Sequence, residues 1–424
     1  MNNEQKPYDF MKEVVRKQPV DKAELLKKAG ILIGSALAFG VIAAFAFAAV
    51  SPYAQDIFGS EESPKVDIPA DDAPEDTGEA QAAAEDAAGE QAQAVVETPA
   101  ATLTLDQYRE LYSSMMDVAD TAEKSIVTVI GLTNNTDWFN QSYESQRQLS
   151  GLVIANNGQD LFIATEYRIV ENVERIQVKF WNETQVDARY LKHDPHTGLA
   201  VLKVPLSSLS AEAAAGIPAA TFGNSYSVTQ GEPVMAVGSP AGYPDAVSYG
   251  AVTSLDNVVS TVDGEYDILI TDITGSSEGS GVLINLQGEV IGLISQSFAG
   301  SGGNTVAAVG ISQIKPLLER LSNSEPLIYS GITGQDVTAA VSEKTGIPEG
   351  IWVDTVQADS PAMLAGIQSG DVIVKVDEED VTTMSKYQDY LESCSQDQVI
   401  RITALRKGTE GYVEITFDVT LGAL

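Results

Sequence analysis

An alternation of apolar and polar residues dominates the middle of the chain. The runs Ser125–Ile130 and Arg175–Phe180 alternate in this way, which is the pattern of a β-strand with one buried face. Short β-branched runs separated by Gly, Asn and Pro continue to about Val309. No helical segments recur between these runs, so the pattern predicts a mainly β domain, a barrel or a sandwich, and not a parallel α/β sheet.

A helix is expected immediately before the first of these strands. Thr104 and Gln107 have the spacing of a capping box, in which each residue satisfies a free N–H group of the other. Apolar residues then recur at helical spacing, at Leu105, Tyr108, Leu111, Tyr112 and Met115. The ordered part of the chain is therefore expected to begin near residue 103.

The longest apolar run lies near the N-terminus. Residues 29–50 contain no charge and no proline, and a helix of this length, at about 1.5 Å per residue, crosses the ~30 Å hydrocarbon layer of a bilayer. Lysines and arginines precede the run and an acidic segment follows it. The positive-inside rule then predicts a single transmembrane helix in the cell membrane, with residues 1–28 cytoplasmic and the bulk of the chain extracytoplasmic. A cleaved signal peptide is the alternative.

Residues 51–102 are expected to form an acidic, Ala-rich, disordered linker. They are rich in Ala, Glu, Asp, Gln and Pro, and such a segment buries too little apolar surface to offset the loss of chain entropy. Its charges repel one another, so the linker is expected to be extended and to hold the later domains away from the membrane.

Charge and cysteine content exclude several classes of partner and site. The net charge of −35 excludes nucleic acid as a partner, because its phosphates repel such a surface. The single cysteine, Cys394, excludes an internal disulfide framework and a multi-cysteine metal site. Its simplest interpretation is a small apolar residue of a helix. No cofactor is expected.

Three segments of the β-rich region resemble the catalytic motifs of a known family. They are Ile163–Val170, Thr197–Lys203 and Thr271–Asn285. They are similar to the His, Asp and Ser motifs of the HtrA/DegP-like serine proteases, which have a trypsin fold and a C-terminal PDZ domain. The resemblance implies a protease-fold domain over residues 103–323, made of two six-stranded β-barrels of the chymotrypsin type with the active site between them.

The side chains of the family's catalytic triad are missing from these motifs. Arg168 stands where the resemblance places the His, and Gly198 where it places the Asp. Acyl transfer by serine needs a base and a group that orients the base, and arginine stays protonated. Counting forward through the third motif puts Ser280 at the nucleophile position, whereas counting back puts Gly279 there. The triad is therefore predicted to be degenerate, in a loop one residue shorter than the family pattern.

The two histidines of the chain allow two alternatives, a catalytic pair with Ser280 and a metal site. His193 and His196 are the only ones in the chain, and both lie near the expected Asp position. An active endopeptidase in which Ser280 pairs with His196 stays open, as does a metal site formed by His193, Asp194 and His196. A polar turn between two strands is the simpler interpretation of this segment, and no metal site is predicted.

Residues 326–424 carry a second resemblance. The segment Gly350–Ile373 is similar to the core of a bacterial PDZ domain, an α+β fold in which Ser-Pro-Ala opens a short helix and Gly-Asp begins the next strand. The family's carboxylate-binding loop falls on Tyr329, Ser330, Gly331 and Ile332. Successive N–H groups around a glycine can point at one C-terminal carboxylate, while a peptide adds to the adjacent strand edge.

The resemblance also places Tyr387 and Leu391 on the other wall of the peptide groove. Ser330 stands where this family usually has an apolar residue, so no peptide preference is carried over. The predicted peptide-binding residues are therefore the loop and these two side chains.

The predicted function is recognition of polypeptides without cleavage, as in a pseudoprotease. The expected partners are polypeptide C-termini or unfolded envelope proteins, in quality control, sensing or regulation. The family resemblance also implies a homotrimer or a mixed assembly with an active paralogue. An active serine endopeptidase that uses Ser280 with a non-standard base is the main alternative, and a structural envelope scaffold is another.

Overall fold

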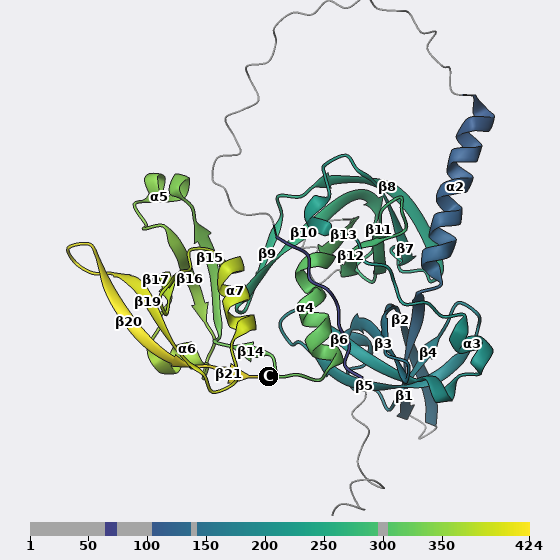
Figure 1. Ribbon diagram of the computed structural model, residues 1–424, viewed down its shortest axis with the longest axis horizontal. Coiled ribbons are helices and arrows are strands. Elements are labelled where there is room, and N and C mark those ends of the chain that lie inside the picture. The colour runs from purple at the N-terminus through teal and green to yellow at the C-terminus, as the bar shows by residue number, and fades with distance from the viewer. Residues whose placement is uncertain (1–63, 74–103, 137–141, 296–303) are drawn as a thin grey trace, which may run out of the picture. The chain divides into compact units, whose positions relative to one another are not determined.

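The computed structural model describes residues 64–73, 104–136, 142–295 and 304–424 (Figure 1). The expected cytoplasmic tail, the expected membrane span at residues 29–50 and most of the expected linker lie outside these residues. Within the described ranges, no helix combines the length and the apolar character needed to cross a membrane.

Helix α2 (Leu105–Glu123) begins where the capping box predicts. The Gln107 N–H donates to Thr104 Oγ1 at 3.3 Å, and the Thr104 N–H donates to Gln107 Oε1 at 3.0 Å. Ala119 is buried in the core, and Met115 packs against it. Leu105, near the start of the helix, is exposed. The second half of α2 therefore attaches the helix to the β domain.

The first barrel is a closed sheet in the order β1-β2-β3-β6-β5-β4 (Figure 1). Strand β1 pairs with both β2 and β4, which closes the ring. Alternate side chains such as Val129, Val153 and Ile163 fill its interior, as the strand period requires. The elements are β1 (Ile126–Thr136), β2 (Ser142–Asn156), β3 (Asp160–Glu166), η1 (Tyr167–Ile169), β4 (Arg175–Lys179), β5 (Gln185–His193), β6 (Leu199–Pro205), η2 (Leu206–Ser208) and α3 (Ala211–Ala215).

The second barrel is built from β7, β8, β10, β11, β12 and β13, and it closes where β10 pairs with β13. The short strand β9 forms a hairpin with β10, in which Thr261 pairs with Gly264 and leaves Val262 and Asp263 as the turn. The prediction of two six-stranded barrels is thus confirmed. The elements are η3 (Ser225–Ser227), β7 (Pro233–Ser239), β8 (Ala246–Ser254), β9 (Val258–Thr261), β10 (Gly264–Thr274), β11 (Ser280–Ile284), β12 (Val290–Ser295), β13 (Thr305–Gly310) and α4 (Ile311–Ser322).

The C-terminal domain is a sheet in the order β15-β16-β17-β19-β20, with β18 beside β17 and a separate β14–β21 pair. Ser360 caps the short helix α6 by accepting the Met363 N–H at 3.2 Å, as the Ser-Pro-Ala motif predicts. Cys394 is buried in this domain's core. The elements are β14 (Ile328–Tyr329), β15 (Ile332–Val337), α5 (Ala339–Thr345), β16 (Gly350–Val356), α6 (Pro361–Ala365), β17 (Val372–Val376), β18 (Glu379–Asp380), α7 (Met384–Ser393), β19 (Val399–Lys407), β20 (Tyr412–Thr420) and β21 (Gly422–Ala423).

The prediction of a disordered linker over residues 51–102 is wrong for residues 64–73. Val66 and Ile68 are buried in the protease-fold core. The Val66 N–H donates to Asn323 Oδ1 and the Asn323 amide donates to the Val66 carbonyl, both at 2.9 Å. The two apolar side chains, two residues apart, are too few to stand out from the acidic composition around them.

An ion pair fixes the far end of this segment. Lys315 on α4 is almost fully buried, and its Nζ lies 2.6 Å from Asp71 Oδ2. Because a buried ammonium needs a partner of opposite charge, Asp71 stabilises the position of Lys315 and holds residues 64–73 on α4.

Candidate active-site cleft and carboxylate-binding loop

The positions expected for the catalytic His and Asp lie side by side in the first barrel. Arg168 is on η1, directly after β3, and Gly198 directly precedes β6. The Tyr167 N–H donates to the Gly198 carbonyl at 2.7 Å, which joins the two loops. Gly198 has φ 72°, and a Cβ built there meets no atom within 4 Å. The fold therefore has room for a side chain at residue 198, although none is present to orient a base.

Two carboxylates hold the Arg168 side chain. Its Nε and Nη2 donate to both oxygens of Glu166 at 2.9 and 3.1 Å, and its Nη1 donates to Glu278 Oε2 at 2.8 Å. Burial acts to lower the pKa of Arg168, but the hydrogen bonds and charges of the two carboxylates raise it above the ordinary arginine value. The guanidinium therefore stays a cation and cannot take a proton from a nucleophile.

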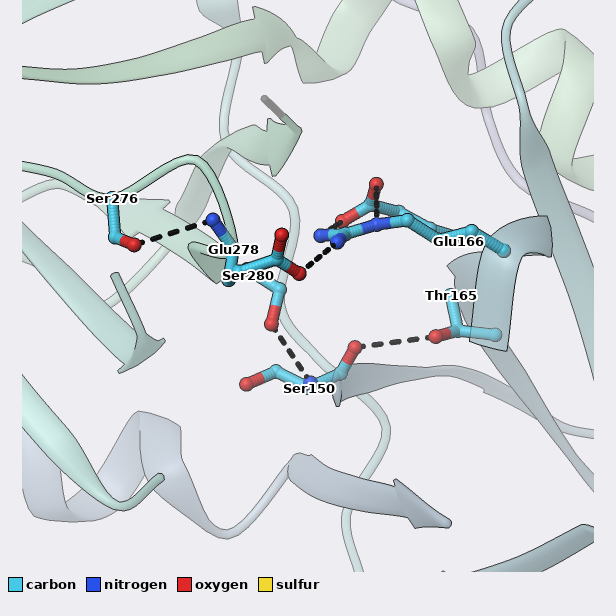
Figure 2. Close-up of polar contacts among 7 residues, drawn as sticks. Ser150, Thr165, Glu166, Ser276, Glu278 and Ser280 are labelled. Atoms are coloured by element: carbon cyan, nitrogen blue, oxygen red, sulfur yellow. Dashed lines mark hydrogen bonds and ion pairs between the residues drawn. The ribbon is translucent and has the colours of Figure 1, made fainter. Parts of the chain in front are cut away.

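The hydroxyl of Ser280 is turned into the protein (Figure 2). Ser280 is the first residue of β11 and is 2% exposed. Its Oγ accepts the N–H of Ser150, on β2, at 2.9 Å. In Figure 2 it points toward Ser150, whereas the Glu278 carboxylate points a different way. The nucleophile candidate is thus packed between the barrels rather than presented to a substrate.

The backbone donors before Ser280 are engaged within their own turn. The Glu278 N–H donates to Ser276 Oγ at 3.2 Å (Figure 2), and the Gly279 N–H donates to the Ser276 carbonyl at 2.8 Å. An oxyanion hole needs such N–H groups aimed at the substrate oxygen. A Cβ at Gly279 would lie 2.3 Å from the Pro240 carbonyl oxygen, so this position does not accept a serine without movement.

Neither histidine lies in the small cavity that holds Ser280. That cavity of about 20 Å³ is lined by residues of β2, β3, β6, β11 and β12. His196 lines a different cavity of about 80 Å³, between the second barrel, α4 and the C-terminal domain, and the two cavities share no lining residue. His193 is stacked on Tyr167 with ring centroids 3.7 Å apart and is hydrogen-bonded to Tyr190. The structure therefore gives no support to a Ser280–His196 pair.

The segment between the two histidines is a capped turn. The Asp194 carboxylate accepts the His196 N–H, the Thr197 N–H and the Thr197 hydroxyl at 3.1, 3.0 and 2.7 Å. No group of His, Cys, Asp or Glu side chains in the part of the chain that the structure describes could hold a metal ion. Asp194 thus shapes the turn between β5 and β6.

The predicted carboxylate-binding loop, Tyr329–Ile332, connects β14 to β15. Gly331 has φ 93°, a left-handed value that favours glycine. The N–H groups of Ser330, Gly331 and Ile332 converge on a single carboxylate at 2.6, 2.8 and 2.9 Å, as expected of an anion-binding nest. That carboxylate belongs to Asp263, in the β9–β10 turn.

The two side chains expected on the groove wall support this loop. Tyr387 and Leu391 lie on α7 and are buried. The Tyr387 hydroxyl donates to Ser330 Oγ at 2.7 Å. Leu391 lines the 80 Å³ cavity together with the turn that carries Asp263. Tyr387 therefore acts behind the loop, and Leu391 faces what occupies the groove.

Two acidic residues at these sites were not predicted from the sequence. Glu278 gives no sequence signal for its pairing with Arg168. The dipeptide Asp263-Gly264 is a general turn signal and could have indicated a turn here, although Gly264 is already paired with Thr261 in the structure. Ser330, the partner of Asp263, is 67 residues away in the chain, a distance at which no local pattern reports contact.

Family models match two parts of the chain. A trypsin-like peptidase domain matches residues 149–293, a range that includes Arg168, Gly198 and Ser280. A PDZ domain matches residues 352–404, which begins after the carboxylate-binding loop.

Curated relatives and solved structures agree with these matches. The chain is 29% identical over 296 residues to a probable periplasmic serine endoprotease, DegP-like, of Rickettsia conorii, covering 67% of this chain and 56% of the relative. A protein of Rickettsia prowazekii with the same description is 30% identical over 281 residues, covering 64% and 52%. The chain thus spans about half the length of these relatives. The solved HtrA-type protease AlgW with a decapeptide has a TM-score of 0.55 and 21% identity, covering 73% of this chain and 98% of that one, and shows the shared fold.

Proposed function

We propose that this homologue of the DegP/HtrA serine proteases, which joins a trypsin-like peptidase domain to a PDZ domain, recognises polypeptides without cleaving them. Its PDZ domain binds polypeptide C-termini, including those of unfolded proteins. The periplasmic descriptions of its relatives support an extracytoplasmic location, and the uncharged apolar run of residues 29–50 supports a single membrane anchor. The family resemblance supports a homotrimer or a mixed assembly with an active paralogue.

The ion cluster around Arg168 is the observation that carries this proposal. A serine protease needs a neutral base at this position to take the nucleophile's proton. Here a permanent cation is bound by Glu166 and Glu278. Two further features act in the same direction: the Ser280 hydroxyl is buried, and the N–H groups of Glu278 and Gly279 are directed at Ser276.

The geometry of Tyr329–Ile332 supports binding of C-termini. A loop whose consecutive N–H groups already hold a carboxylate has the donors that a terminal carboxylate requires. The adjacent strand β15 offers an edge to which an extended peptide can add.

Proteolysis of fluorescein-labelled casein by the purified full-length chain, beside its Ser280→Ala variant, tests the absence of cleavage. We expect no cleavage by either protein, with an active DegP-like protease as the positive control. Cleavage that disappears in Ser280→Ala would overturn the proposal. Labelling of Ser280 by a fluorophosphonate would count against it in the same way.

The double variant Arg168→His, Gly198→Asp tests whether the chain lacks only the catalytic side chains and keeps the geometry of the active site. An aspartate at residue 198 has space, and its left-handed φ costs about 1 kcal/mol. We expect this variant to stay inactive on casein because the Ser280 hydroxyl remains buried. Strong proteolysis would show that the cleft retains its catalytic geometry.

A further inference from the structure

We propose that Asp263 is a built-in ligand of the carboxylate-binding loop, so that the PDZ domain accepts an external C-terminus only after the β9–β10 turn has left the loop. This inference rests on the proposed function in one respect, namely that a polypeptide C-terminus is the external ligand.

The Asp263 carboxylate makes the contacts expected of a bound terminal carboxylate. Its Oδ2 accepts the N–H groups of Ser330 and Gly331 at 2.6 and 2.8 Å, and its Oδ1 accepts the Ile332 N–H at 2.9 Å. The Ser330 hydroxyl also donates to Oδ1, at 2.5 Å. Four donors on one carboxylate leave no free N–H in the loop for a second anion.

The backbone of the turn extends the likeness to a bound peptide. A peptide that adds to the edge of a PDZ sheet exchanges main-chain hydrogen bonds with the strand after the loop. The Asp263 N–H donates to the carbonyl of Ile332, the first residue of β15, at 2.6 Å. The turn therefore uses both the anion-binding donors and the first acceptor on the strand edge.

The residues that follow Asp263 fill the space beside α7. The Glu265 N–H donates to Gln388 Oε1, on α7, at 3.2 Å. A Cβ at Gly264 would lie 2.4 Å from the same oxygen, so the turn is tightly packed against the helix. An external chain cannot lie between β15 and α7 while this turn is in place.

The charge at this contact is balanced by hydrogen bonds alone. Asp263 is 7% exposed, and no lysine or arginine in the described part of the chain forms an ion pair with it. Burial raises the pKa of Asp263, and the bonds from Ser330, Gly331 and Ile332 oppose the rise. A carboxylate held in this way can be replaced only by a group with the same charge and acceptors, which a C-terminus provides.

The contact is intramolecular, so Asp263 competes at a high effective concentration. In the docked state, the β9–β10 turn occupies the carboxylate-binding loop. If nine-tenths of the molecules are in this state, the apparent affinity for an external ligand falls about tenfold. Removal of the Asp263 carboxylate should restore that affinity.

Peptide binding by the full-length chain tests this directly. The probe is a fluorescein-labelled decapeptide library with free C-termini, compared with the same library amidated at the C-terminus. We expect Asp263→Asn to bind the free-acid library about tenfold more tightly than the wild type, with no gain for the amidated library. Asp256→Asn, at an exposed acidic residue of the preceding β8–β9 loop, is the charge control and should match the wild type.

Acetate provides a second readout that needs no peptide. In Asp263→Ala the loop donors lose their carboxylate, so acetate should raise the melting temperature of this variant more than that of the wild type, at matched ionic strength. Acetamide should have no such effect. Equal peptide binding by the wild type and Asp263→Asn would overturn the inference and leave the proposed function standing. Absence of peptide binding in both, with acetate rescue retained, would reject C-termini as ligands and keep Asp263 as the internal one. Absence of acetate rescue would overturn the inference.

Discussion

Arg168→Ala removes the cation from between two carboxylates that lie in very different surroundings. The side chain of Glu166 is 9% exposed, that of Arg168 is 34% exposed and that of Glu278 is 75% exposed. Breaking a buried ion pair by removing one partner costs about 3–5 kcal/mol, because the other charge is left buried. Since Arg168 is one-third exposed, we expect a smaller cost, about 2–3 kcal/mol.

The carboxylates of Glu166 and Glu278 are expected to contribute differently to the stability of the cluster. Glu278→Gln should destabilise by less than about 1 kcal/mol, because the pair it breaks is mostly in solvent. The double variant Glu166→Gln, Arg168→Ala should recover about half of the loss in Arg168→Ala, because no buried charge remains. Arg175→Ala is the control: Arg175 forms an exposed ion pair in the same barrel, and its loss should cost no more than about 0.5 kcal/mol.

Urea unfolding followed by tryptophan fluorescence measures these differences as shifts in the midpoint at constant slope. The reasoning would be refuted if the double variant were no more stable than Arg168→Ala, or if Glu278→Gln cost as much as Arg168→Ala. Either outcome would mean that the buried charge of Glu166 does not dominate the cluster.

Burial and neighbouring carboxylates raise the pKa of Glu265 from 4.5 to about 7 in the docked turn; docking is therefore strongest below pH 4.5 and weakens as the pH rises to about 7. Peptide affinity should thus increase by about 5- to 30-fold from pH 5 to pH 8 in a fluorescence titration, and Glu265→Gln should flatten the profile. Asp71→Asn leaves its buried lysine partner unpaired and should cost about 2 kcal/mol in urea unfolding, whereas Lys65→Ala, at an exposed pair, should cost about 0.5 kcal/mol or less. Gly198→Ala and Gly331→Ala both place alanine at positive φ, but only the latter meets a side-chain atom, at 2.2 Å; it should lower the melting temperature markedly more.

The barrels and the PDZ domain could be predicted because their signals are local or ordered along the chain. Strand alternation, the capping box at Thr104 and the Ser-Pro-Ala start of α6 each depend on neighbouring residues. The assignment of Arg168 and Gly198 to triad positions, and of Tyr329–Ile332 to the carboxylate-binding loop, came from motif order and stays a prediction. The loop's ability to bind an anion followed from its backbone, since Gly331 permits the left-handed turn that aligns the N–H groups.

What the sequence did not reveal depends on contacts between distant segments. The pairing of Arg168 with Glu278 joins residues 110 positions apart, and that of Asp71 with Lys315 joins residues 244 apart. Each is a short-range electrostatic contact whose partner is selected only when the strands and helices have packed. The burial of Val66 likewise depends on the surface that α4 offers, which no composition average over the linker can report.

An acidic side chain of the second barrel occupies each of the two sites: Glu278 contacts Arg168, and Asp263 contacts the carboxylate-binding loop. The two contacts differ in strength. Glu278 reaches Arg168 from solvent, and an ion pair of this kind contributes only about 0–1 kcal/mol. Thermal motion can open it, so the absence of cleavage that we propose must come from the missing base and the buried Ser280 hydroxyl, and not from a blocked cleft. Asp263 is almost fully buried and accepts four hydrogen bonds, and the cost of burying its charge offsets part of what these bonds contribute. We therefore expect a chain end to compete with Asp263 better than an internal segment does, because only the chain end supplies a carboxylate for the same donors.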